Sequence, residues 1–250
     1  DAATRAMKLP PTWPVLDTAT RPRAWLFVLC AVLAVVVGFV TVSPHTAERL
    51  IAAGVQIDRD PTDLQTPGGG YGVRFFDPDG RLIEVSADVA TKEARALEPR
   101  ESIPGKLSHV VINTPNLEAT RTFYQDLLGF RLSDWLQDFM CFLRINPEHH
   151  SLAIAAAPTA TLNHISFEMR GIDEYLRGTG RMLRGGHDLL WGPGRHGAGD
   201  NTFSYFSDPT GNVIEYTRNA AGQPTTIARR VPAAGNLAEG VPARIATTIV

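Results

Sequence analysis

A strand–turn–strand pattern occupies residues 207–216, which read Ser207-Asp208-Pro209-Thr210-Gly211-Asn212-Val213-Ile214-Glu215-Tyr216. The same pattern stands 131 positions earlier, as Phe76-Asp77-Pro78-Asp79-Gly80-Arg81-Leu82-Ile83-Glu84-Val85. In both copies an Asp-Pro-x-Gly turn precedes a run of aliphatic and β-branched residues, which is typical of two strands joined by a tight turn. A second pair of matching stretches is Leu107-Ser108-His109-Val110-Val111 and Leu162-Asn163-His164-Ile165-Ser166. These repeats predict a chain built from copies of one structural unit.

Hydrophobic periodicity around these repeats predicts a unit with the order βαβββ. The unit is complete twice between residues 106 and 218, and a further copy occupies residues 36–90. We therefore expect an α+β fold in which tandem βαβββ modules form curved mixed sheets. The expected strands are Val36–Val42, Val55–Ile57, Tyr71–Phe76, Leu82–Ser86, Leu107–Asn113, Arg131–Leu136, Met140–Ile145, Ser151–Ala156, Leu162–Met169, Leu189–Trp191, Thr202–Phe206 and Val213–Thr217, and the expected helices are His45–Ala53, one capped by Asn116 and stopped by Gly129, and one near Ile172–Leu183.

The modules divide the chain into two domains, the first of them incomplete. Residues 36–90 form a partial amino-terminal domain with one module, and residues 106–218 form a domain with two modules. The intervening residues 91–105 carry charges and two prolines and are interpreted as a linker. Residues 1–35, an irregular lead and apolar run, and residues 219–250, an irregular tail, receive no role.

Composition excludes several classes of protein. The 24 Lys and Arg residues nearly balance 26 Asp and Glu residues, and no basic stripe occurs, which argues against nucleic-acid binding. Two cysteines, Cys30 and Cys141, make neither a disulfide framework nor a zinc cluster. With 44% apolar residues the chain is typical of a globular protein, and we expect it in the cytoplasm.

The apolar run from Ala24 to Val42 is the exception to this composition. It carries no charge, and about 20 apolar residues are long enough to span a bilayer. Three interpretations stay open: a truncated or altered amino terminus, a membrane anchor, and a divergent module. The anchor interpretation would make the protein membrane-attached, and it would consume the strand expected at Val36–Val42.

Histidines cluster in the region of the two complete modules. His109 and His164 stand at equivalent positions of the repeat, which places them at one height of a curved sheet. Glu215, inside the last strand, is a carboxylate that needs a partner. A single strand histidine is more often a core or rim residue, but the equivalence of the pair favours function. Two imidazoles and one carboxylate supply three ligands to Fe(II) or Mn(II) and leave open positions, so we expect the sheets to curve around a metal site.

A longer motif joins these residues to a known family. Gly194-Arg195-His196 is followed, after seven residues, by Ser204-Tyr205-Phe206-Ser207-Asp208-Pro209-Thr210-Gly211-Asn212-Val213-Ile214-Glu215. This spacing resembles the signature of the type I extradiol ring-cleaving dioxygenases of the vicinal oxygen chelate superfamily. Ser204 departs from the pattern, since the family usually has an aliphatic residue or Phe there. The resemblance covers Leu107–Arg218 well and residues 36–90 more loosely.

The resemblance implies a role for each matching residue. It implies that His109, His164 and Glu215 bind the metal, Fe(II) with Mn(II) as the alternative. It implies that His150 is the active-site acid/base, and that His196 and Tyr205 hydrogen-bond the catechol oxygens. His149 is expected to be a bystander, because adjacent strand side chains point to opposite faces.

The function implied by the resemblance is extradiol (meta) cleavage of a catechol-type ortho-diol with O2, in aromatic compound degradation. The partners are then a catechol and O2, and we also expect a homo-oligomer. The alternatives are another metalloenzyme of the superfamily, an isomerase or thiol transferase, and a non-catalytic module that binds an aromatic ligand. Glu84, the repeat equivalent of Glu215, lacks histidine partners and is interpreted as structural or solvent-facing.

Overall fold

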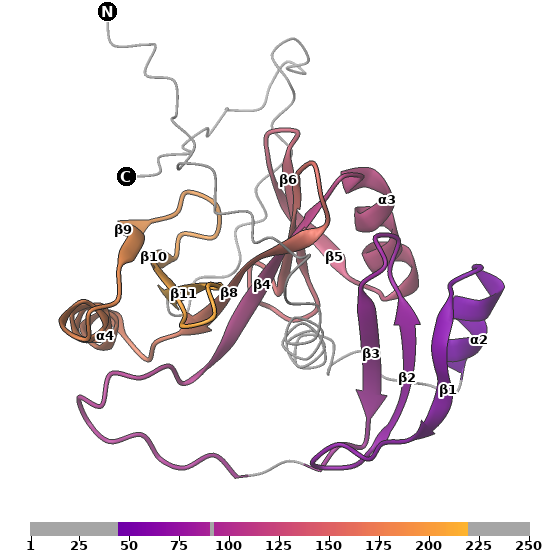
Figure 1. Ribbon diagram of the computed structural model, residues 1–250, viewed down its shortest axis with the longest axis horizontal. Helices are drawn as coiled ribbons and strands as arrows, with labels where there is room; N and C mark the ends of the chain where they lie inside the picture. Colours follow the sequence, from indigo (N-terminus) through magenta and orange to yellow (C-terminus); the bar gives the residue numbers. More distant parts are fainter. Residues whose placement is uncertain (1–44, 91–92, 220–250) are drawn as a thin grey trace, which may run out of the picture.

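The computed structural model describes residues 45–90 and 93–219. Within them the chain folds into a three-stranded and an eight-stranded sheet with flanking helices, which confirms the α+β class (Figure 1). The expected strand Val36–Val42, the apolar run Ala24–Val42 and nearly all of the expected tail lie outside the described residues. Across the two described segments, no helix combines the length and apolar character needed to cross a membrane.

The three-stranded sheet comprises β1 (Ile57–Asp63), β2 (Tyr71–Phe76) and β3 (Leu82–Ala87), all antiparallel, after helix α2 (His45–Ala52). β1 was predicted to end at Ile57, with a loop beyond it, and that prediction is wrong. β1 is an edge strand whose register against β2 shifts twice. An edge strand tolerates Pro61 and its charged neighbours, which in a central strand would break the ladder.

The eight-stranded sheet has the order β5-β6-β7-β4-β8-β11-β10-β9. Its centre is the antiparallel pair β4 and β8, the first strands of the two complete modules. On either side of that pair, β7 and β11 run parallel to the strand they adjoin. The strands are β4 (Lys106–Thr114), β5 (Arg131–Leu136), β6 (Met140–Arg144), β7 (Leu152–Ala156), β8 (Thr161–Glu168), β9 (Leu189–Arg195), β10 (Thr202–Ser207) and β11 (Val213–Arg218).

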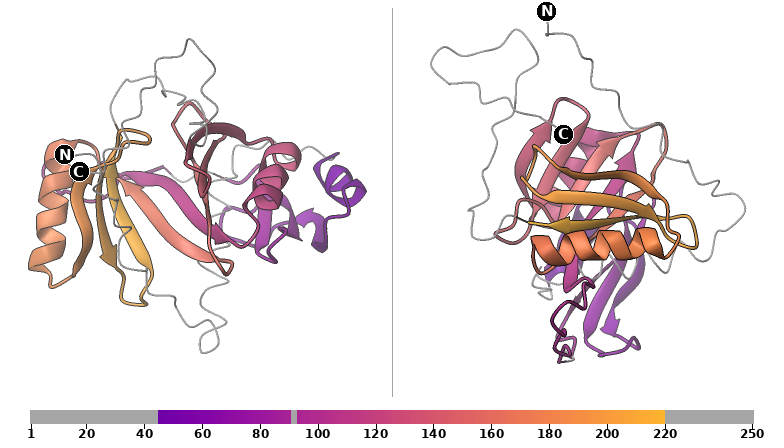
Figure 2. Two further views of the ribbon diagram at one scale, coloured as in Figure 1. Left: turned by 90° about the horizontal axis from the view of Figure 1, so that it is seen from above. Right: turned by 90° about the vertical axis from the view of Figure 1, so that its left-hand side faces the viewer.

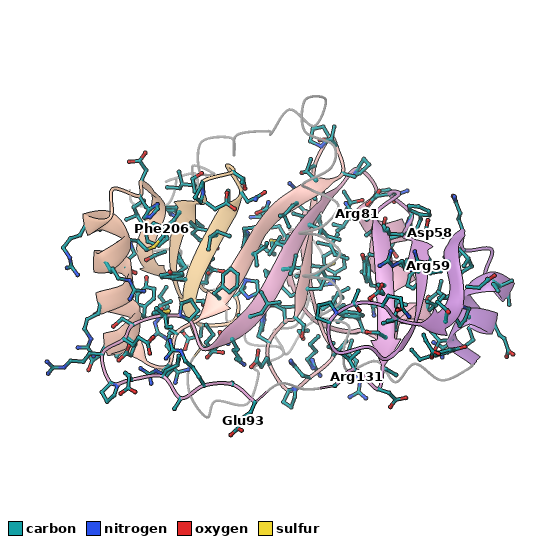
Figure 3. All side chains as sticks on the ribbon, turned by 60° about the horizontal axis from the view of Figure 1, so that its bottom comes forward. Asp58, Arg59, Arg81, Glu93, Arg131 and Phe206 are labelled. Atoms are coloured by element: carbon teal, nitrogen blue, oxygen red, sulfur yellow. The ribbon has the colours of Figure 1, made fainter. Side chains whose placement is uncertain are left out.

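Two helices lie toward opposite ends of this sheet (Figure 2). α3 (Leu117–Thr122) begins as predicted at Asn116, whose side chain accepts a 3.2 Å hydrogen bond from the Ala119 amide. It continues as a wider π-helical turn, η1 (Phe123–Leu127), which was not predicted. α4 (Ile172–Arg184) packs Tyr175 against Phe206 and Tyr216 of the sheet, and Phe206 is labelled in Figure 3.

The three-stranded sheet and one half of the large sheet share a single hydrophobic core. Phe75 and Ile83 of the small sheet belong to the same buried cluster as Ile112 of β4 and Tyr124 of η1. Above this core lies Arg81, which Figure 3 labels at the boundary between the sheets. Its guanidinium pairs with Asp77 and Asp79 at 2.7 Å each and donates to the carbonyl of Asn113 in β4.

The two copies of the turn have the same internal hydrogen bonds, which explains why the Asp-Pro-x-Gly motif recurs. Oδ1 of Asp77 accepts from the amides two and four residues ahead, at 3.0 and 2.8 Å. Oδ1 of Asp208 does the same at 2.8 and 2.7 Å. An aspartate at the start of each turn therefore holds the loop closed in both copies.

Candidate metal centre

Three strands bring His109, His164 and Glu215 together. Ser166 of β8 pairs with His109 of β4 on one side and with Glu215 of β11 on the other. His164 stands two residues from Ser166 on the same strand, so side-chain alternation places it on the same face. The candidate ligand atoms all lie within 4.8 Å of one another. Glu215 Oε2 is 3.0 Å from His109 Nε2 and 3.5 Å from His164 Nε2.

The atoms of this cluster fit a divalent cation. Glu215 Oε2 makes no hydrogen bond, although it lies 3.0 Å from His109 Nε2, and His164 Nε2 is also buried without a hydrogen-bond partner. An unsatisfied buried polar atom is costly. Burial lowers the pKa of His164, which keeps its imidazole neutral. Burial alone would raise the pKa of Glu215, but the neighbouring imidazoles of His109, His164 and His196 bring it well below its usual range. Neutral imidazoles and an ionised carboxylate are the forms that bind a metal.

A polar neighbour orients each of the two imidazoles. Ser108 Oγ lies 3.1 Å from His109 Nδ1, and Asn163 Oδ1 lies 2.8 Å from His164 Nδ1. Engaging Nδ1 leaves Nε2 as the nitrogen that faces the cluster, as is usual for metal-binding histidines. Sequence reasoning missed both neighbours. The signal was present in the repeat, because a hydrogen-bonding residue precedes the histidine in each copy.

His196 and Tyr205 lie beside the carboxylate. Tyr205 of β10 is the direct cross-strand partner of Glu215, and its hydroxyl lies 2.9 Å from His196 Nε2. His196 Nε2 is also 3.5 Å from Glu215 Oε1. Burial, and then the charge of Glu215, raises the pKa of the Tyr205 phenol well above its usual range. The phenol therefore keeps its proton as a potential donor.

An aromatic group not predicted from the sequence surrounds this pair. Trp191 of β9 stacks on the Tyr205 ring at 5.3 Å between centroids, and His196 stacks on Phe203 at 4.0 Å. β9 extends four residues beyond its predicted end at Trp191. The segment Gly192-Pro193-Gly194 is typical of a turn, but an edge strand with one neighbour can contain it.

The His150 ring contacts the His109 ring, with 4.0 Å between the ring centroids. Burial, followed by the neighbouring His109 and His149, lowers its pKa well below the usual value, so the imidazole is neutral. The expectation that His149 points away from His150 is wrong. Both residues lie in the irregular segment 145–151 between β6 and β7, where strand alternation does not apply, and their Nδ1 atoms are 2.9 Å apart.

The structural interpretation of Glu84 is confirmed. Its carboxylate accepts a 2.7 Å hydrogen bond from Arg74 Nε on the neighbouring strand. It is buried rather than solvent-facing. The repeat therefore carries one carboxylate in a cluster of imidazoles and its equivalent in an ordinary cross-strand ion pair.

Known proteins are similar to this chain in sequence. Residues 106–216 match the Glyoxalase/Bleomycin resistance protein/Dioxygenase superfamily. Metapyrocatechase 2 of Cupriavidus necator is 32% identical over 190 residues, covering 68% of this chain and 58% of that protein. The 2,2',3-trihydroxybiphenyl dioxygenase of Sphingomonas paucimobilis is 30% identical over 212 residues, covering 70% of this chain and 71% of that protein.

A solved structure is also similar. The Mn(II)-bound glyoxalase from Novosphingobium aromaticivorans is 46% identical, with a TM-score of 0.69, and the match covers 76% of this chain and 64% of that one. The chain thus spans less than two thirds of the length of this protein and of metapyrocatechase 2.

Proposed function

Because this chain belongs to the extradiol dioxygenases of the Glyoxalase/Bleomycin resistance protein/Dioxygenase superfamily, we propose that it cleaves a catechol-type ortho-diol with O2. The ring bond that breaks is the one beside the two hydroxyl groups, and both oxygen atoms enter the product. One observation carries the proposal: the unpartnered ligand atoms of His164 and Glu215 lie beside His109 and within a group that also holds His150, His196 and Tyr205.

In this proposal His109, His164 and Glu215 hold the metal. We assign Fe(II), with Mn(II) as the alternative, since the solved glyoxalase similar to this chain is bound to Mn(II). Either cation would lower the pKa of a chelating catechol hydroxyl and supply the electron chemistry that O2 requires. The three residues supply two imidazoles and a carboxylate, which are ligands that such cations accept.

The remaining residues act on the substrate. The protonated phenol of Tyr205 and His196 Nε2, 2.9 Å apart, supply two adjacent polar groups for the oxygens of the diol. His150 is a buried neutral imidazole, so it can accept a proton from a hydroxyl and later return it. Trp191 stacks on Tyr205 and packs at a tilted angle against Phe203, so these rings make the surroundings of the two polar groups apolar, as an aromatic substrate ring requires.

A second candidate is favoured by the 46% identity to the solved glyoxalase. A metal-dependent isomerase would use the three ligands but would not need His150. Metal-dependent isomerase activity that survives a His150→Ala substitution would support this candidate, whereas loss of catechol cleavage in the same variant supports the dioxygenase.

Oxygen uptake tests the proposal. Protein loaded anaerobically with Fe(II) or Mn(II) is given a panel of catechols, and we expect O2 consumption with a yellow ring-opened product. Glu215→Gln should reduce uptake to background, whereas Glu84→Gln, at the equivalent position of the repeat, should retain it. Absence of uptake by protein with a bound metal would refute the proposal.

A further inference from the structure

Asp134, His149 and His150 form a row of side chains that leads to the metal centre. Nδ1 of His149 lies 2.9 Å from Nδ1 of His150. On its other side, Nε2 of His149 lies 3.4 Å from Oδ2 of Asp134, an ion-pair distance. His150 in turn contacts His109. His149 therefore connects a carboxylate of β5 to the imidazole beside the proposed ligands.

The row is buried and closely packed. The side chains of His149 and Asp134 are 10% and 6% exposed. The Phe142 ring contacts both imidazoles, with centroid distances of 5.2 and 5.0 Å. Gly199 packs so closely that a Cβ atom there would lie 3.1 Å from His149 Nδ1. The position and orientation of His149 are therefore constrained from several sides.

The contacts select one arrangement of protons. His149 Nε2 is buried and makes no hydrogen bond in this geometry, and Asp134 Oδ2 lies 3.4 Å from it. A buried carboxylate favours an N–H group opposite it, so we place the proton of His149 on Nε2, facing Asp134. Nδ1 of His149 then has a lone pair and accepts from Nδ1–H of His150. A neutral imidazole has one N–H, so Nε2 of His150 is left with its lone pair. The row thereby fixes the tautomer of His150 as well as the plane of its ring.

We propose that His149, held by Asp134, is a positioning residue that sets the tautomer and orientation of His150. This inference rests on the proposed function, in which His150 must offer a lone pair to the substrate. His149 then has a role in the site, although it holds neither the metal nor the diol.

Imidazole ¹⁵N–¹H correlation spectra of the metal-free protein test the tautomer directly. His150 should show Nδ1–H and an unprotonated Nε2, and the assignment is made with His150→Phe. In His149→Phe, which removes both nitrogens and keeps a ring, this single tautomer should give way to a mixture. An unchanged His150 tautomer in His149→Phe would overturn the inference.

Steady-state kinetics of the metal-loaded protein supply the second readout. We expect His149→Phe to lower kcat for catechol by about 10- to 100-fold, the usual loss for a partner of a site residue, with KM and metal content unchanged. His149→Asn, which places an amide where Nδ1 stood, should restore most of kcat. His187→Phe is the matched control, because His187 lies near the end of α4 and outside the row.

Failure of the proposed function and failure of the positioning role give different results. If wild-type protein shows no catechol cleavage, the proposed function falls while the spectra still decide the tautomer. If wild-type protein is active and His149→Phe keeps its kcat, or loses metal in step with activity, the positioning role falls and the proposed function stands.

Discussion

The hydroxyl of Tyr124 donates a 3.2 Å hydrogen bond to Oδ2 of Asp77, and so joins η1 to a turn of the three-stranded sheet. The same carboxylate oxygen pairs with Arg81, whose other partners are Asp79 and the Asn113 carbonyl. The side chains of Arg81 and Asp77 are 6% and 0% exposed. A buried charged network thus adds to the shared hydrophobic core in attaching the small sheet to the large one.

Replacing Arg81 by Met should strongly destabilise the fold. Asp77 and Asp79 would be left buried without their cation, and breaking a buried pair by removing one partner costs about 3–5 kcal/mol. Urea unfolding followed by tryptophan fluorescence measures the change. The control is Arg195→Met, which removes the partner of Asp200 from an exposed pair and should cost about 1 kcal/mol or less. Equal losses in the two variants would contradict the importance of the network.

Two glycines of α4 should respond in opposite directions to alanine. A Cβ on Gly178 would lie 2.7 Å from Met169 Cε and 3.1 Å from the Ser102 carbonyl oxygen, so Gly178→Ala should destabilise. A Cβ on Gly180 would meet Arg184 at 3.7 Å, an ordinary contact. Gly180→Ala should therefore raise the free energy of unfolding by up to about 1 kcal/mol through helix propensity. Thermal unfolding of both variants checks the signs, and a stabilised Gly178→Ala would refute the close packing.

Asn163 should matter for metal affinity without touching the metal. Its Oδ1 accepts from Nδ1 of His164, and its own Nδ2 donates to Asn113 Oδ1 at 2.9 Å. Asn163→Leu removes that support, and we expect metal affinity to fall by about 10- to 100-fold. Calorimetric titration with Mn(II) provides the measurement. Asn163→Asp keeps an acceptor at the same place and should bind more tightly than Asn163→Leu; the reverse order would exclude the orienting role.

Cys141 should resist alkylation in the folded protein. Burial raises the pKa of its thiol to about 12, so the reactive thiolate forms only at strongly alkaline pH. In the unfolded chain the thiol ionises near its ordinary pKa. Between these two values the folded chain binds the extra proton, so this group lowers stability as pH rises through that range. Labelling with iodoacetamide at pH 8, in a Cys30→Ser background, should be slow in buffer and fast in urea. Comparable rates would show that the thiol is accessible.

The sequence predicts the structure best where the local residue pattern agrees with the burial of those residues in the fold. The alternation of β11 and the aspartate turn before it place Glu215 inward, and the predicted bounds of β10 and β11 differ from the observed ones by one residue. The repeat equivalence of His109 and His164 also predicted their proximity, because β4 and β8 are neighbours at the centre of the sheet.

The predictions that failed concern local structure that depends on contacts with other parts of the fold. β1 contains Pro61 and several charges, and it becomes a strand by pairing with β2. η1 widens within a sequence that has ordinary helical periodicity. Strand alternation predicted that His149 points away from His150. Residues 145–151 are not part of a strand, however, and the two histidines face each other there. Each of these features depends on contacts that a linear pattern does not contain.

The placement of His109 and Glu215 on separate strands has a consequence for the lifetime of the protein. These residues lie about a hundred positions apart, so a cation held between them would act as a removable cross-link across a long loop. Only the folded chain presents the three ligands together, so each tenfold excess of free metal over Kd would add about 1.4 kcal/mol to the free energy of unfolding. Metal supply would then govern how long the chain survives proteolysis, in addition to how fast it turns over substrate.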